Sequence, residues 1–194
     1  MAKQFFATFP NDDLTLSYLF SYGKEVVDFA ESRGVDAVRF ERGKAVRQQV
    51  ESFLSANNPG LVYFTGHGSD NSVCGYKQEP IIVSGENERL LKSKIVYSLS
   101  CSSASVLGEE AVGKGAKAFA GYNDDFVFLF DKNKTLTPLK DEIARNFLEP
   151  SNALILSLLK GNAVEKAFDM SQKSFEKKIS KLLTSEPIPG HENL

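Results

Sequence analysis

Two uninterrupted apolar runs constrain the fold of this chain more than any other feature. They occupy residues 61–65 (LVYFT) and 94–99 (KIVYSL). A strand that buries only one face alternates apolar and polar residues, whereas a continuous run is typical of a strand that is covered on both faces. Parallel sheets with helices on either side bury their strands in this way. The two runs therefore favour a largely parallel sheet.

Helical and strand-like segments alternate along the rest of the chain, which indicates βαβ units. Helical periodicity is clear over residues 14–32, with Asp12 or Asp13 available as the N-cap, and over residues 46–54. Three-layer α-β-α architecture with a mostly parallel sheet is the fold class that follows. The other segments expected are strands at 4–9, 36–40, 116–120 and 126–130, a hairpin or irregular loop at 72–84, and helices at 86–91, at 105–112 and from 137 onward.

Length and composition indicate one ordinary globular domain. Of 194 residues, 42% are hydrophobic and 25% are charged, and the formal net charge is −2, which gives no reason to expect a nucleic-acid or membrane partner. No apolar run approaches the roughly 18 residues of a transmembrane helix, and the first residues lack signal-peptide features. The two cysteines are too few for a disulfide scaffold, so a reduced, cytoplasmic setting is expected. We expect one domain over residues 1–184 and a tail over 185–194, which holds two prolines and a glycine.

Side chains suited to catalysis or ligand binding follow three of the predicted strands. His67 lies between two glycines after the strand at 61–65, and Cys101 follows the strand at 94–99. Because parallel strands present their carboxyl ends at one edge of a sheet, ligands bind there, and the two side chains are expected to meet. A thiolate is a nucleophile, and a nearby imidazole can move its proton. An acidic stretch containing Asp124 and Asp125 follows the next strand.

Each of these residues also has a purely structural interpretation. A cysteine at a strand end is commonly a packing residue, and Asn-Asp-Asp is typical of a turn. Cys74 is expected to be a half-buried thiol. A zinc site formed by the two cysteines, His67 and His191 is disfavoured because the spacing matches no common zinc pattern. The position of His67 and Cys101 directly after neighbouring buried strands favours a catalytic role over a purely structural one.

The segments YFTGHGS and VYSLSCSSAS resemble the two signatures of the caspase-like cysteine peptidases of clan CD. The CHAT-domain peptidases are the most similar subgroup, with gingipain-like and clostripain-like peptidases as relatives. The segments GKGAKAFAGYNDD and LEPSNALILSLLKGNAVEKAFDMSQKSF are similar to further parts of the CHAT pattern. The resemblance covers residues 60–178, and it implies a caspase-like sheet.

The resemblance implies hydrolysis of a peptide bond through a thioester acyl-enzyme, without a metal or cofactor. His67 would be the general acid and base, Cys101 the nucleophile, and the backbone N–H groups of Gly68 and Cys101 would form the oxyanion hole. The partner would be a protein or peptide substrate, with a separate activating protein as a further expectation.

The residues that would choose the substrate are less well defined by the resemblance. Relatives that cut after Arg or Lys often carry Asp two residues before the cysteine, where this chain has Leu99. Asp124 and Asp125 are the alternative acidic wall for a basic side chain, and Ser100 is a further expected substrate contact.

Two other functions remain open at this stage. The first is a catalytically silent caspase-like module that acts through a partner protein. The second is a doubly wound domain that binds a nucleotide or flavin. This second function is disfavoured because the turn after Phe9 is Pro-Asn-Asp-Asp, whose acidic residues would repel phosphate.

Overall fold

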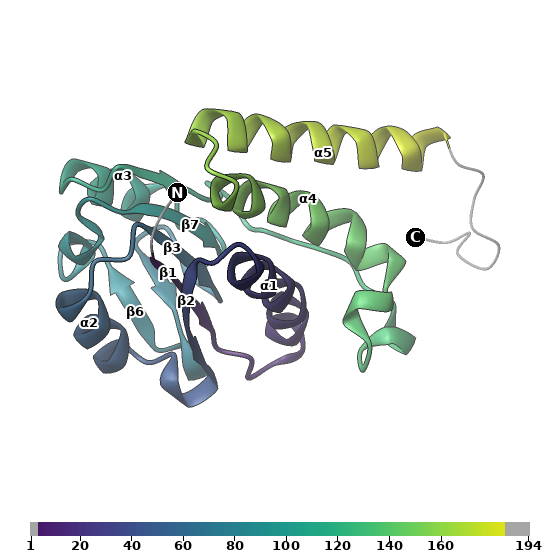
Figure 1. Cartoon of the computed structure of the whole chain (residues 1–194). Coiled ribbons are helices and arrows are strands. Elements are labelled where there is room, and N and C mark those ends of the chain that lie inside the picture. Colours follow the sequence, from purple (N-terminus) through teal and green to yellow (C-terminus); the bar gives the residue numbers. More distant parts are fainter. Residues whose placement is uncertain (1–3, 185–194) are drawn as a thin grey trace.

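A five-stranded parallel sheet forms the centre of the molecule (Figure 1). The computed structural model describes residues 4–184. The strand order is β2-β1-β3-β7-β8, and every neighbouring pair is parallel. The bounds are β1 (Gln4–Phe9), β2 (Asp36–Glu41), β3 (Leu61–Thr65), β7 (Ile95–Leu99) and β8 (Ala118–Ala120). The parallel sheet predicted from the apolar runs is confirmed.

Helices cover both faces of this sheet and complete a three-layer sandwich. One apolar cluster joins the sheet to α1 (Leu14–Ser32) and α4 (Glu142–Leu159). The opposite cluster joins it to α2 (Arg47–Ala56) and α3 (Val106–Gly113). Strand β3 shows why its sequence is continuously apolar. Leu61 and Tyr63 belong to the first cluster, Val62 and Phe64 belong to the second, and all four are buried.

A small antiparallel sheet interrupts the alternation after β3. It contains β4 (Gly68–Ser69), β5 (Ser72–Cys74) and β6 (Pro80–Val83), in that order. The pairing of β5 with β6 confirms the hairpin expected within 72–84. The helix expected at 86–91 is a single 3-10 turn, Glu88–Leu91.

The strand expected at 126–130 is wrong, because this segment belongs to neither sheet. Its side chains nevertheless alternate: Phe128 is buried, whereas Val127 and Leu129 are 69% and 53% exposed. The phenylalanine rings pack against one another and against Tyr18 and Tyr122. The alternating pattern therefore reflects a chain that lies over the aromatic core without a neighbouring strand.

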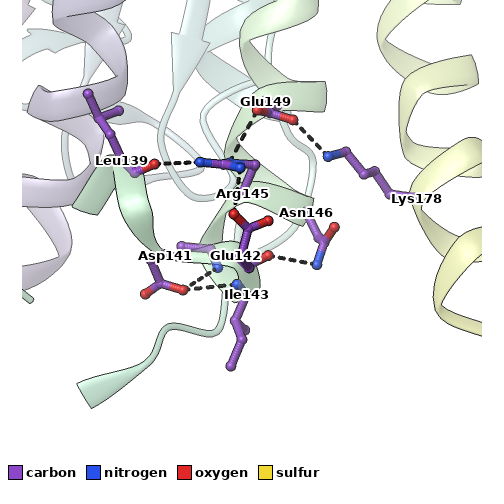
Figure 2. Close-up of polar contacts among 9 residues, drawn as sticks. Leu139, Asp141, Glu142, Ile143, Arg145, Asn146, Glu149 and Lys178 are labelled. Carbon is purple, nitrogen blue, oxygen red and sulfur yellow. Dashed lines mark hydrogen bonds and ion pairs between the residues drawn. The ribbon is translucent and has the colours of Figure 1, made fainter. Parts of the chain in front are cut away.

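Two long helices end the described chain, and α5 (Val164–Thr184) lies along α4 on the side away from the sheet (Figure 1). Asp141 caps α4 by accepting hydrogen bonds from the N–H groups of Ile143 and Ala144. Glu149 of α4 accepts a hydrogen bond from Lys178 of α5 at 2.7 Å (Figure 2).

The predicted tail, 185–194, lies outside the described residues. None of the helices within residues 4–184 is long and apolar enough to cross a membrane.

Candidate active site

The turns that follow β3 and β7 lie against each other. The two strands pair in register through Thr65 and Leu99, so the next residues of both chains emerge at the same sheet edge. Gly68 marks the point of contact, because a Cβ atom placed there would lie 2.8 Å from the carbonyl oxygen of Cys101 and 2.9 Å from the Cβ of Ser100. Only glycine fits this approach, which brings the backbone of Gly68 against the backbone of Cys101. The predicted oxyanion hole, formed by the N–H groups of these two residues, stays a prediction.

His67 is held by Asp13, which the sequence indicated as a helix cap and not as a partner of His67. Its Nε2 lies 2.6 Å from Oδ2 of Asp13, while Oδ1 of Asp13 accepts a hydrogen bond from the N–H of Leu16 at the start of α1. Because a carboxylate only accepts, Nε2 is the donor in this contact, and in a neutral ring Nδ1 then carries the free lone pair. Asp13 thus fixes the tautomer in which Nδ1 is the basic atom.

The missed role of Asp13 depends on the order of the strands. Asp13 follows β1 and His67 follows β3, and these two strands are neighbours although β2 lies between them in sequence. The chain turns from β2 on one side of β1 to β3 on the other, so the crevice between β1 and β3 is the topological switch point of the sheet. An acidic residue after a strand was the available signal, but its proximity to His67 required the strand order.

Cys101 is half-buried, and its surroundings act on the thiol in opposite directions. Burial raises the pKa of Cys101, and the nearby carboxylate of Asp125 raises that pKa further, because both disfavour a negative sulfur. A hydrogen bond from the backbone N–H of Phe126 lowers it in part. The net direction is upward, so the resting sulfur is a neutral thiol at neutral pH.

Buried hydroxyl groups support the turn that carries Cys101. Oγ of Ser98 lies 2.6 Å from Oγ of Ser100 and 2.9 Å from Oγ of Ser103, and all three residues are buried. Ser102 adopts a left-handed conformation with φ of 54°. The side chain of Ser100 is therefore engaged by the hydroxyl groups beneath the turn, and its contact with a substrate stays a prediction.

The acidic loop after β8 folds over the same turn. The carbonyl oxygen of Asp124 accepts a hydrogen bond from the N–H of Ser102, and that of Tyr122 accepts one from the N–H of Ala104. Asp124 and Asp125 are exposed, and Asp124 also caps the N–H of Asp125 in the way expected of a turn. The stretch is thus a bend held against the Cys101 turn by its main chain, and the carboxylate of Asp125 is the one that acts on the Cys101 thiol.

Within residues 4–184, no hydrogen bond joins the His67 ring to the sulfur of Cys101. The thiol instead interacts with Asp125 and with the N–H of Phe126. Direct transfer of a proton from the sulfur to Nδ1 of His67 requires these two atoms to come within hydrogen-bond distance.

Cys74 ends β5 on the small sheet and offers no comparable set of partners. Its backbone N–H donates to the carbonyl oxygen of His67. Burial raises the pKa of the Cys74 thiol, and a hydrogen bond with Ser72 lowers it in part. No group of three or more His, Cys, Asp and Glu side chains arranged to hold a metal occurs between residues 4 and 184.

Two open hollows on the surface lie away from this site. The larger, of about 500 Å³, lies at the end of β2 and is lined by Arg39, Glu41, Arg42, Gly43 and Lys44. The smaller, of about 270 Å³, is lined by Gly60, Leu61, Ile95, Lys117, Leu158, Gly161 and Asn162. Neither of these two hollows is lined by His67 or Cys101.

Comparison with known proteins identifies no family. No protein-family model and no curated protein matches the chain. Among solved structures, a flavodoxin from Megasphaera elsdenii matches with a TM-score of 0.38 and 11% identity, over 63% of this chain and 87% of the flavodoxin. A flavodoxin from Streptococcus pneumoniae TIGR4 matches with a TM-score of 0.32 and 11% identity, over 75% and 94% of the two chains.

Proposed function

We propose that this protein is a cysteine endopeptidase in which Cys101 attacks a peptide carbonyl carbon and His67 moves the protons. The observation that carries the proposal is the register of β3 with β7, which brings the turns of His67 and Cys101 into contact at the carboxyl edge of the sheet. The switch point beside these turns is where open α/β sheets bind their ligands.

The reaction proceeds in two balanced steps. The sulfur of Cys101 gives its proton to Nδ1 of His67 and bonds to the carbonyl carbon, and the C–N bond breaks as His67 protonates the departing amine. Water then attacks the thioester carbon as His67 takes a proton from that water. The C–S bond breaks, the acid product leaves, and His67 returns the proton to the sulfur, which restores the thiol. The N–H groups of Gly68 and Cys101 stabilise the negative oxygen in each step.

An unpaired main-chain segment beside the thiol favours an extended peptide as substrate. The backbone groups of residues 126–130 make no hydrogen bond to another backbone group of the described chain. This segment begins at Phe126, whose backbone N–H lies near enough to the Cys101 sulfur to lower the pKa of the thiol. A peptide strand can pair with such a segment and place its scissile carbonyl near Cys101. Asp124 and Asp125 would then favour a basic side chain near the cleaved bond.

The raised pKa of Cys101 favours a second candidate, a caspase-like module that binds a partner and does not hydrolyse peptides. A neutral thiol that is not bonded to His67 is a poor nucleophile until it is rearranged. Alkylation at neutral pH separates the candidates. A peptidase is expected to alkylate faster at Cys101 than at Cys74, and a peptide substrate is expected to protect Cys101 from alkylation, whereas a silent module would show neither effect.

Cleavage of a mixed peptide library, read by mass spectrometry, tests the proposal directly. The wild-type chain and Cys74→Ala are expected to cleave the same peptides, and Cys101→Ala is expected to cleave none of them. Circular dichroism of both variants controls for folding. Equal cleavage by wild type and Cys101→Ala would contradict the proposal.

A further inference from the structure

Helix α5 carries an apolar stripe that the rest of the described chain leaves open. Phe168, Ile179 and Leu182 are 49%, 55% and 54% exposed, and Phe175 between them is half-buried. Spacings of seven, four and three residues place these four side chains on one face of the helix. An exposed row of large apolar side chains is a feature of interaction surfaces.

Helix α4 covers the adjoining face of α5 and leaves this stripe beside it. Ala167 and Ser171 are the buried residues of α5, and Ser171 donates a hydrogen bond to the carbonyl oxygen of Pro150 in α4. The Lys178–Glu149 ion pair joins the two helices further along (Figure 2). The outer side of α5 faces away from the sheet (Figure 1). The stripe is thus bounded on one side by α4.

Three acidic residues form the other boundary of the stripe. Asp169 and Glu176 directly follow Phe168 and Phe175, so they lie about 100° further around the helix. Glu165 precedes Asp169 by one turn and shares this edge. All three are exposed, and none takes part in an ion pair with another residue between 4 and 184.

The lysines of α5 do not neutralise this edge. Lys166, Lys173 and Lys177 lie about 160° from the stripe, on the opposite side of the helix. A partner that covers the stripe therefore meets carboxylates along its rim and not ammonium groups. This distribution also disfavours an anionic membrane surface, because the lysines would point away from it.

We propose that the stripe of α5 binds an amphipathic helix of a partner protein whose rim carries Lys or Arg. The apolar face of that helix would cover Phe168, Ile179 and Leu182, and its cations would lie opposite Glu165, Asp169 and Glu176. A second copy of this chain fits less well, because antiparallel packing of two α5 helices would bring their acidic edges together. This surface is independent of the proposed hydrolysis.

Binding of two matched synthetic peptides to the full chain tests the proposal. Both peptides are helical and share one leucine stripe, but one carries lysine along the rim and the other carries glutamate. Fluorescence anisotropy is expected to give at least tenfold tighter binding of the lysine peptide. The exposed double substitution Ile179→Ser with Leu182→Ser is expected to weaken that binding about tenfold, with helicity retained by circular dichroism.

Charge substitutions on the two edges of α5 provide the matched control. Replacing Glu165, Asp169 and Glu176 by Gln, Asn and Gln is expected to weaken binding of the lysine peptide about tenfold. Replacing Lys166, Lys173 and Lys177 by Gln is expected to leave its affinity within about twofold.

Four results would overturn the proposal. The two peptides could bind equally, or the serine substitutions could leave binding unchanged. Sedimentation could show a wild-type dimer that Leu182→Ser dissociates, which would make a second copy the occupant. Vesicles rich in anionic lipid could bind the chain through the stripe, which would make a membrane the occupant.

Discussion

The regions around the two cysteines differ in what surrounds the sulfur and not in how exposed it is. Both thiols are half-buried, and burial raises both pKa values. Cys101, however, follows a strand of the parallel sheet, where the turns of β3 and β8 approach it. Cys74 ends a strand of the small antiparallel sheet and has Ser72 as its polar neighbour. Placement at the carboxyl edge of a parallel sheet, more than thiol exposure, therefore puts Cys101 beside the turns that carry the other residues of the proposed site.

The largest effect is expected from His67→Ala. Loss of the imidazole removes the group that accepts and returns the proton, and general acid–base catalysis contributes roughly 10²- to 10⁴-fold. Peptide hydrolysis is expected to fall by a factor in that range, measured as kcat/KM. The rate of Cys74 alkylation should stay the same in this variant. Full hydrolysis by His67→Ala would contradict the proposed role of His67, and the Cys101 region would then have no catalytic partner that the Cys74 region lacks.

A smaller effect is expected from Asp13→Asn. Asparagine caps a helix about as well as aspartate, so the melting temperature should hardly change, while the charge that holds Nε2 of His67 is lost. We expect kcat to fall about tenfold with little change in KM, together with an altered pH profile. Asp12→Asn is the matched control, because the Asp12 carboxylate accepts from the backbone N–H of Lys77 instead. Equal losses in both variants would contradict a positioning role for Asp13.

Asp125→Asn is expected to change the thiol itself. The Asp125 carboxylate disfavours the thiolate, so its removal lowers the pKa of Cys101 and increases the thiolate fraction at neutral pH. Iodoacetamide should then alkylate Cys101 severalfold faster at pH 7, and Cys74 at an unchanged rate. Slower alkylation of Cys101 in Asp125→Asn would contradict this prediction, because it would mean that the Asp125 carboxylate promotes formation of the thiolate.

The smallest effect is expected on the Cys74 side, from Ser72→Ala. The hydrogen bond with Ser72 lowers the pKa of Cys74, so its loss raises that pKa and slows alkylation of Cys74 at neutral pH. Hydrolysis of peptides should be unaffected. A loss of hydrolysis in Ser72→Ala would connect the small sheet to the active site and weaken the comparison.

Sequence reasoning succeeded where the signal was local. The continuous run 61–65 predicts burial on both faces, and the positions of His67 and Cys101 directly after buried strands predict a shared sheet edge. Both follow from the geometry of a parallel sheet without knowledge of the strand order.

The features that were missed depend on tertiary neighbours. Asp12 and Asp13 are equally good caps by sequence, and only the proximity of β1 to β3 gives Asp13 its contact with His67. The alternation in 126–130 is the same for a paired and an unpaired segment, so the pattern could not exclude a strand. The exposure of the α5 stripe likewise depends on how much of the helix α4 covers.

The central claim is that His67 and Cys101 act on one substrate, and a covalent peptide probe tests it most directly. A library of peptidyl acyloxymethyl ketones reacts with a cysteine that the peptide-binding site presents, and peptide mapping locates the label. We predict labelling of Cys101 in the wild-type chain, strongly reduced labelling in His67→Ala, and no labelling of Cys74. Labelling confined to Cys74, or labelling of Cys101 that is unchanged in His67→Ala, would contradict the account.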